Sequence, residues 1–438
     1  MFEAIQNIFR IPELRKRIGF TMAMLFVYRI GCHIPTPGIN GDALARLFQH
    51  AQQQGGNLLG MFDMFTGGAL QRLSVFALGI MPYISSSIIF QLLTVVVPPL
   101  EKLSKEGDAG RKKIVQYTRY GTVLLSVIQG AGIAIGLESM QGGGNEMIVA
   151  APGWAFRLMT ILTLTSGTIF LMWLGEQMTE RGIGNGISLI IFAGIVDRIP
   201  TAVINTFKKL THDEIPLFTV LLVIAVILAF VAAIVFVERG QRRLPIHYAK
   251  RVVGLKTYGG QTSHLPLKVN MAGVIPPIFA SSLIMFPATI ANFVDIPAIK
   301  WTASQLMPGM FLYEVIFVVL IIFFCYFYTS VTFNPIDVAE NVKRHGGYIP
   351  GIRPGKETSE YIDRVLSKLT FVGAIYISLV CVLPTVMTQK MHLPFYFGGT
   401  AILIAVGVGM DTVAQIESHL ITRSYEGFMK GVRIRGRR

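Results

Sequence analysis

Long apolar runs recur along the chain and are separated by shorter polar stretches. An α-helix needs about 20 apolar residues to cross the hydrocarbon core of a bilayer, which is roughly 30 Å thick. By this rule the pattern predicts about ten membrane-spanning helices, so the expected fold class is an all-α polytopic membrane protein. The runs are residues 18–34, 72–97, 114–137, 155–175, 184–204, 215–237, 268–293, 311–333, 369–387 and 397–418.

The second run contains the stretch LGIMPYISSSIIFQLL, which carries polar groups on one helix face. At about 100° per residue, one narrow stripe holds Ile80, Ile84, Ser87 and Gln91. An unpaired amide in hydrocarbon costs several kcal/mol, so the stripe should face a bundle interior or a wet cavity. Pro82 is expected inside the same helix, where neighbouring groups would have to cover the freed backbone. From this helix alone, helix packing and a pore lining both remain open.

Later runs repeat the combination of branched apolar and polar side chains. Ile187 and Ile191 lie one turn apart after the glycine-rich segment TERGIGNGIS, and Asn270 is expected two turns before Ile278 on a nearby face. The last run has a stripe of Ile404, Val408, Asp411 and Gln415. Together these faces predict a narrow apolar constriction with wetter surfaces beside it, which could gate by dewetting.

Composition agrees with a membrane protein and argues against metal or cofactor chemistry. Of 438 residues, 52% are hydrophobic and 15% charged, which is too apolar for an ordinary soluble domain. Cys32, Cys325 and Cys381 show no CxxC spacing, and the histidines form no HExxH pair. The glycines of TERGIGNGIS superficially suggest a dinucleotide loop, but no strand precedes them. No cofactor and no metal site are expected.

The basic residues are distributed unevenly between the two sets of loops. If the runs span the membrane in turn, 30 of the 39 Lys and Arg residues fall on the side that holds both termini, and nine on the other. Cytoplasmic loops carry the excess of positive charge, so both termini are predicted to be cytoplasmic. Arg29, near the far end of the first run, is expected to snorkel to the interface.

Two large loops on the basic side have sequence patterns typical of folded loops, whereas membrane topology alone requires only basic residues. In residues 238–268, alternating apolar and polar residues between glycine turns predict a hairpin. In residues 334–368, two Pro-Gly turns predict a stiff tip that presents Arg353. We therefore expect docking surfaces for a large cytoplasmic partner. An RNA-containing partner and an acidic protein patch both fit the net charge of +14.

A short apolar segment, residues 57–68, lies between glycine pairs and is too short to span the bilayer. The segment fits either a re-entrant piece or an ordinary interfacial loop.

Six long motifs in order resemble the bacterial SecY family, whose members form the pore of the Sec protein translocase. They are LGIMPYISSSIIFQLL, SKEGDAGRKKIVQYTRYGT, WLGEQMTERGIGNGISLIIFAGI, VNMAGVIPPIFASS, FNPIDVAEN and GYIPGIRPG. The resemblance implies a channel of two inverted, pseudo-symmetric five-helix halves, residues 1–210 and 211–421, followed by a basic cytoplasmic tail, 422–438. It implies a passive channel, not an enzyme. Unfolded secretory polypeptides would cross the bacterial plasma (inner) membrane through it, and membrane segments would leave laterally into lipid.

The same resemblance implies roles for individual residues and partners. The constriction ring would be Ile80, Ile84, Ile187, Ile191, Ile278 and Ile404. The plug would be residues 57–68, with Asn57, Leu58, Leu59, Met61, Phe62, Met64, Phe65, Gly67 and Gly68. A lateral gate would include Ser87, Gln91, Asn270 and Ser281. Partner docking would use Arg242, Arg243, Lys250, Arg251 and Arg353. Expected partners are the SecE and SecG membrane subunits, the SecA ATPase, the ribosome, signal peptides, unfolded preproteins and the lipid bilayer.

Two other classes of membrane protein are alternatives to the channel. A secondary transporter would use Asp411, Glu314 or Asp197 as ion-coupling carboxylates. However, Asp197 and Glu314 sit near predicted span ends, and large shaped loops have no role in such transport. An integral membrane enzyme would need a nucleophile, a metal site or paired carboxylates, and the sequence offers no such constellation.

Overall fold

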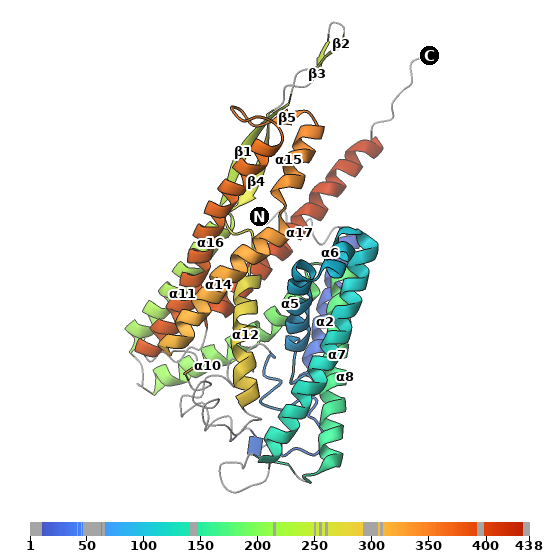
Figure 1. Cartoon of the computed structure of the whole chain (residues 1–438). Coiled ribbons are helices and arrows are strands. Elements are labelled where there is room, and N and C mark those ends of the chain that lie inside the picture. The colour runs from blue at the N-terminus through green and yellow to red at the C-terminus, as the bar shows by residue number, and fades with distance from the viewer. Residues whose placement is uncertain are drawn as a thin grey trace. The chain divides into compact units, whose positions relative to one another are not determined.

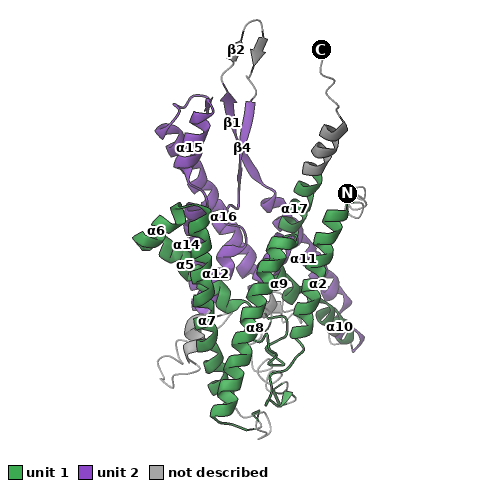
Figure 2. Cartoon of the chain, turned by 90° about the vertical axis from the view of Figure 1, so that its right-hand side faces the viewer, with its two compact units in different colours: residues 1–208, 285–308, 408–438 green, residues 209–284, 309–407 purple. Residues whose placement is uncertain are grey.

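The computed structural model describes residues 11–41, 43–44, 46, 63, 66–139, 148–149, 151–212, 216–248, 251–253, 256–258, 262–291, 305–306, 310–391 and 398–431. The chain divides into two compact units (Figure 2). Unit 1 comprises Met1–Lys208, Met285–Pro308 and Val408–Arg438, and unit 2 comprises Lys209–Ile284 and Gly309–Gly407. The division into halves at residues 210 and 211 stays a prediction.

In unit 1, the long helix α8 (Trp154–Arg181) contacts several other helices (Figure 1). Small residues on α8 allow close approach. A side chain on Gly167 would overlap the carbonyl of Val75, and one on Gly175 would press on Ile187. The helices that contact α8 are α2 (Pro12–Gly31), α5 (Met81–Val96), α7 (Asp108–Ser139) and α9 (Gly186–Val196). The short α6 (Pro98–Lys105) packs on α5 and α7, and α10 (Arg198–Thr211) follows α9.

In unit 2, α14 (Phe311–Thr332) packs along α16 (Lys356–Met391), and α15 (Pro335–Arg344) also packs on α16. Helix α12 (Ile275–Ala291) begins in this unit and ends in unit 1, and its Phe279 lies edge-to-face on Phe324 of α14, with ring centroids 5.6 Å apart. Helix α11 (Leu217–Glu238) leads into the strands, and α17 (Gly399–Gly431) begins in this unit and continues into unit 1.

The strands of unit 2 form two small antiparallel sheets. Strands β4 (Thr262–Lys268), β1 (Gln241–Tyr248) and β5 (Gly347–Tyr348) pair in the order β4-β1-β5. Strands β2 (Arg251–Val253) and β3 (Lys256–Tyr258) pair with each other beyond β1.

Each of the ten predicted runs contains a helix. Among the described residues, seven helical stretches are long and apolar enough to cross a membrane. The bent pair α5 and α6, which turns by 99°, makes an eighth if it is counted as one span. The remaining two runs hold α2 and the shorter apolar helix α12. The prediction of an all-α polytopic membrane protein is confirmed.

The second run is not one helix, which corrects the expectation for Pro82. Residues 66–80 form a succession of turns, with Gly79 at a positive φ of 57°, and α5 begins only at Met81. Pro82 therefore stands in the first helical turn, where its missing N–H leaves no intrahelical bond unmade. The Ile80 carbonyl still accepts the Ile84 N–H at 3.1 Å, so the predicted stripe starts at the helix N-cap.

The seventh run also begins its helix later than predicted. Helix α12 starts at Ile275, and the following pair, Pro276 and Pro277, suits a first turn but not a helix interior. Residues 269–274 form a turn that contains Asn270, with Gly273 at a positive φ of 64°. The prediction that Asn270 lies in the same helix as Ile278, on a nearby face, is therefore wrong.

Candidate functional site

Four of the isoleucines expected in a constriction lie in unit 1, on helices that both contact α8. Ile80 and Ile84 at the start of α5 are 2% and 6% exposed, and Ile191 on α9 is 2% exposed. Ile187 is half-buried, and a methyl group on Gly175 of α8 would lie 3.0 Å from its Cγ1 atom. The shared packing on α8 holds two pairs of branched apolar side chains within one unit.

The N-terminus of α9 is specified by local chemistry. The Asn185 side chain caps it by accepting the backbone N–H groups of Ile187 at 3.1 Å and Ser188 at 3.4 Å. The preceding Gly184 has a positive φ of 86°, and its N–H donates to Gln415 Oε1 of α17 at 2.8 Å. The glycine-rich segment thus serves to start a helix that carries Ile187 and Ile191.

The other two expected ring residues belong to unit 2, and both are buried. Ile278 lies in the first turns of α12, and Ile404 lies on α17 with no exposed surface. The two elements touch, because a side chain on Gly407 of α17 would overlap Val274, just before α12. A closed ring of all six isoleucines remains a prediction.

The polar residues expected at a lateral gate all have partners within their own units. On α5, the Gln91 amide donates to Ser87 Oγ at 3.4 Å, which confirms that the two share a helix face. In unit 2, Asn270 Nδ2 donates to Glu238 Oε1 at 2.6 Å and to the Gly273 carbonyl at 3.1 Å, joining the end of α11 to the turn before α12. The Ser281 hydroxyl donates to the Ile278 carbonyl at 2.9 Å.

Most of the expected plug lies outside the described residues. This applies to Asn57, Leu58, Leu59, Met61, Phe62, Met64 and Phe65. The described part comprises Asp63 and the end of the segment, where Gly67 and Gly68 have positive φ values of 65° and 79°.

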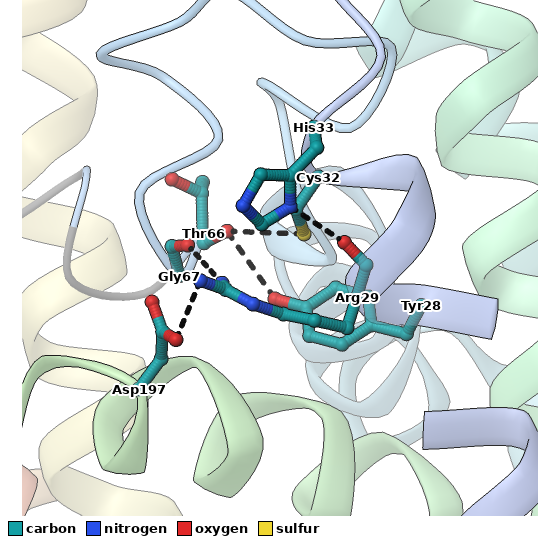
Figure 3. A network of polar contacts seen from close by, with 7 residues as sticks. All are labelled: Tyr28, Arg29, Cys32, His33, Thr66, Gly67 and Asp197. Atoms are coloured by element: carbon teal, nitrogen blue, oxygen red, sulfur yellow. Dashed lines mark hydrogen bonds and ion pairs between the residues drawn. The ribbon is translucent and has the colours of Figure 1, made fainter. Parts of the chain in front are cut away.

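A polar network links that end of the segment to α2 and α9 (Figure 3). The Arg29 guanidinium pairs with Asp197 Oδ1 at 2.5 Å and donates to the Gly67 carbonyl at 3.1 Å. The Tyr28 hydroxyl donates to the Thr66 carbonyl at 3.2 Å. The sequence did not indicate this network, because its members are far apart along the chain and Arg29 and Asp197 belong to no motif.

The described parts of the two large basic loops, residues 238–268 and 334–368, are brought together in one folded element, which we call the loop module (Figure 1). The predicted hairpin is confirmed: β1 and β4 pair from Gln241 opposite Lys268 to His247 opposite Thr262. Strand β5 from the second loop pairs with His247 and Tyr248 of β1. A small core of Leu244, Leu267, Ile349 and Ile362 is buried between the hairpin, the second loop and α16.

This core orients the expected docking residues outward. Ile349 and Ile352 pack into it, while Arg353 between the two Pro-Gly turns is exposed. The Thr358 hydroxyl donates to the Arg353 carbonyl at 2.8 Å and ties the turn to α16.

Other docking candidates are described less fully. Arg242 and Arg243 on β1 are also exposed. Arg251 is placed only as backbone, opposite Tyr258, and Lys250 lies outside the described residues.

The described residues give little support to a secondary transporter or a membrane enzyme. Asp197 is engaged by Arg29, Asp411 is exposed on α17, and Glu314 lies in the first turn of α14. Among the described residues, no three His, Cys, Asp or Glu side chains are placed to hold a metal ion.

Comparison with known proteins decides the family. The SecY family model matches residues 74–413, which is most of the chain. The chain belongs to the SecY family. The protein translocase subunit SecY of Escherichia coli (strain K12) is 51% identical over 430 residues, which cover 97% of this chain and 96% of that relative.

Solved structures share the fold of this SecY family member. A structure described as that of a protein conducting channel matches with a TM-score of 0.65 and 17% identity, covering 95% of this chain and 97% of the other. Sec61 in the canine ribosome-channel complex from the endoplasmic reticulum matches with a TM-score of 0.62 and 15% identity, with the same coverage of both chains. At these identities the likeness establishes the fold alone.

Proposed function

We propose that this chain is the channel-forming subunit of a translocase, through which unfolded secretory polypeptides cross the bacterial plasma membrane. The observation that carries the proposal is the 51% identity to a protein translocase subunit SecY over nearly the whole chain. The channel is passive, and a separate partner supplies the energy for forward movement. Membrane segments of the substrate leave it laterally into lipid.

The physical task of such a channel is to spare the substrate the cost of exposing its backbone to hydrocarbon. Each unsatisfied backbone group there costs several kcal/mol, so a water-lined route lowers the barrier. The constriction of that route is the ring of Ile80, Ile84, Ile187, Ile191, Ile278 and Ile404. Isoleucine side chains close around any sequence, because dispersion contacts need no specific partner groups. Five of these six residues are buried and Ile187 is half-buried, which supports the assignment.

A lateral gate between the channel and lipid uses the polar face of α5 and the start of α12. Ser87 and Gln91 stand on one side, and Asn270 and Ser281 on the other. A signal peptide carries 7–15 consecutive apolar residues. It gains about 0.8 kcal/mol for each CH₂ group that it buries, which is enough to bias the gate toward opening.

The loop module docks the cytoplasmic partner that drives transport, either the SecA ATPase or the ribosome. The SecE and SecG subunits accompany the chain in the membrane. Exposed Arg242, Arg243 and Arg353 on a module with its own core support this role, as does the net charge of +14. The solved relative of the same fold that is in complex with a ribosome is consistent with it. The excess of basic residues on this side supports a cytoplasmic location for both termini.

Residues 57–68 form the plug that seals the empty channel. Support comes from the end of the segment, whose backbone is held by side chains of α2. Removing residues 57–68 should let preproteins with defective signal sequences through, because the closed state loses its seal. Unchanged rejection of such preproteins in an export assay would contradict the assignment.

A reconstitution experiment tests the proposed function. The chain is placed in liposomes with its two small membrane subunits, and SecA, ATP and a preprotein are added. Protection of the preprotein from external protease that requires both ATP and a functional signal sequence is the expected result. No protection, in a complex shown to be intact and bound to SecA, would refute the proposal.

A further inference from the structure

Hydrogen bonds within unit 1 fix the end of the plug segment. The Asp63 carboxylate accepts the backbone N–H of Gln71 at 2.9 Å, and its carbonyl accepts the N–H of Gly68 at 3.0 Å. These bonds tie Asp63 to residues 68–71, and Asp63 and Thr66 are both buried. We call Asp63 together with residues 66–68 the plug base.

Two adjacent side chains of α2 bind two adjacent carbonyls of the plug base (Figure 3). Tyr28 donates to the Thr66 carbonyl at 3.2 Å, and Arg29 donates to the Gly67 carbonyl at 3.1 Å. Both carbonyls lie outside any helix, and the Thr66 carbonyl also accepts the Ala69 N–H at 3.4 Å and the Cys32 thiol at 3.9 Å.

Gly67 fits this site for steric reasons. Its φ of 65° lies in the left-handed region, which favours glycine. A Cβ atom there would lie 2.9 Å from the Tyr28 hydroxyl oxygen and 3.0 Å from the Cα atom of Gly194 on α9. The plug base therefore touches α2 and α9 at one residue that tolerates no side chain.

Asp197 completes the arrangement from the C-terminal end of α9. Its carboxylate holds the guanidinium of Arg29 while another nitrogen of that group reaches Gly67. Both side chains keep part of their surface exposed, 37% for Arg29 and 30% for Asp197. An ion pair this exposed is weak in screened solvent, so it can bias a two-state equilibrium without locking it.

We propose that Arg29, oriented by Asp197 and assisted by Tyr28, is a latch that holds the plug base against α2 and α9 in the resting channel. Displacement of the plug breaks the bonds to Thr66 and Gly67, so their strength sets how often the empty channel opens. This inference rests on the proposed function, and it assigns positioning roles to Arg29 and Asp197 that the channel motifs do not contain.

The first test is the resting ion conductance of the reconstituted complex with Asp197→Asn. The variant keeps the shape of the side chain and removes its charge, so Arg29 loses the partner that orients it. We expect the open-state population of the empty channel to rise roughly fivefold, the factor that corresponds to about 1 kcal/mol. Arg119→Gln is the matched control, because it breaks the Arg119–Glu176 ion pair between α7 and α8 without touching the plug base. A resting conductance equal to that of the control would overturn the latch.

Two further variants separate the latch from a general structural role. Tyr28→Phe removes only the hydroxyl that binds Thr66, so it should raise the resting conductance without unfolding the protein. The exchange Arg29→Asp with Asp197→Arg restores an ion pair but places a carboxylate beside the Gly67 carbonyl. It should remain leaky, and a fully restored seal would show that the ion pair alone matters and would overturn the latch.

Failure of the latch can be told apart from failure of the proposed function in the same liposomes. If the unmodified chain gives ATP-dependent protease protection but Asp197→Asn and Tyr28→Phe leave the conductance unchanged, only the latch is refuted. If the unmodified chain gives no protection, the proposed function is refuted, and the latch with it.

Discussion

The start of α5 and the loop module differ in the contacts that hold them and in the side chains that they present. At the start of α5, the apolar side chains of Ile80 and Ile84 are buried. In the loop module, strand pairing, Pro-Gly turns and a small core fix the backbone so that Arg353 points into solvent. The first region can adapt its shape, whereas the second presents charge at a defined place.

This difference matches what each region would contact. A channel constriction meets every sequence that is exported, so contacts without directional preference suit it. A docking surface must recognise one partner, so it needs fixed charges whose arrangement discriminates between partners. Substitutions that change side-chain shape should therefore impair partner docking by the loop module more than sealing by the ring. Substitutions that make a ring residue polar should impair sealing.

The largest effect is expected from Leu267→Ala in the core of the loop module. Leu267 has no exposed surface, and truncating a buried leucine costs about 2–5 kcal/mol. The module should lose protection against amide hydrogen exchange and bind SecA or ribosomes weakly, while resting ion conductance stays unchanged. Normal exchange protection in β1 and β4 would contradict the assigned core.

A somewhat smaller effect is expected from Arg353→Glu at the tip of the module. Reversing a charge at the centre of a docking surface should cost about 2 kcal/mol, roughly a 30-fold loss of affinity. Partner-driven export falls while membrane insertion of the chain remains normal. Lys356→Glu, an exposed change three residues along, is the control. Equal export by the two variants would remove Arg353 from the docking role.

The ring should respond to polarity. Ile84→Ser places a hydroxyl at the constriction, so the dewetted gap fills with water and resting conductance rises several-fold. Ile89→Ser on the exposed side of the same helix is the matched control and should leave conductance unchanged. SecA binding should be normal in both. Equal single-channel conductance of the two variants would contradict the ring.

The smallest effect is expected from Ile84→Leu, which changes shape but not polarity. Such swaps in apolar surroundings usually cost less than about 1.5 kcal/mol. Export and resting conductance should stay within about twofold of the unmodified chain, because dispersion contacts tolerate the new shape. A large loss of export would show that the ring needs a specific isoleucine geometry and would weaken the comparison with the loop module.

The sequence predicted what depends on local pattern. Each apolar run contains a helix, and the alternation in residues 238–268 produced the hairpin of β1 and β4. The proline positions were misread, because apolar length alone does not locate a helix start. Pro82 and the pair Pro276 and Pro277 mark first helical turns, and that rule could have placed both starts correctly.

The sequence pattern did not predict contacts between distant segments of the chain. Nothing in the pattern near Arg29 indicates that its partner is Asp197 or that it reaches the Gly67 carbonyl. The two basic loops were predicted separately, and their shared core of Leu244, Leu267, Ile349 and Ile362 appears only in the structure. Such contacts form only when the chain folds, so they leave no local motif in a single sequence.

Crosslinking of a stalled preprotein tests the central claim, that polypeptides pass through the isoleucine ring of this chain. A photoreactive residue is placed at Ile84, Ile191, Ile278 or Ile404, and at Leu162 and Phe236, which are exposed apolar positions expected to face lipid. We expect crosslinks to the preprotein from the four ring positions and none from the two controls. Crosslinks absent from the ring, with the preprotein shown to be stalled in the complex, would contradict it.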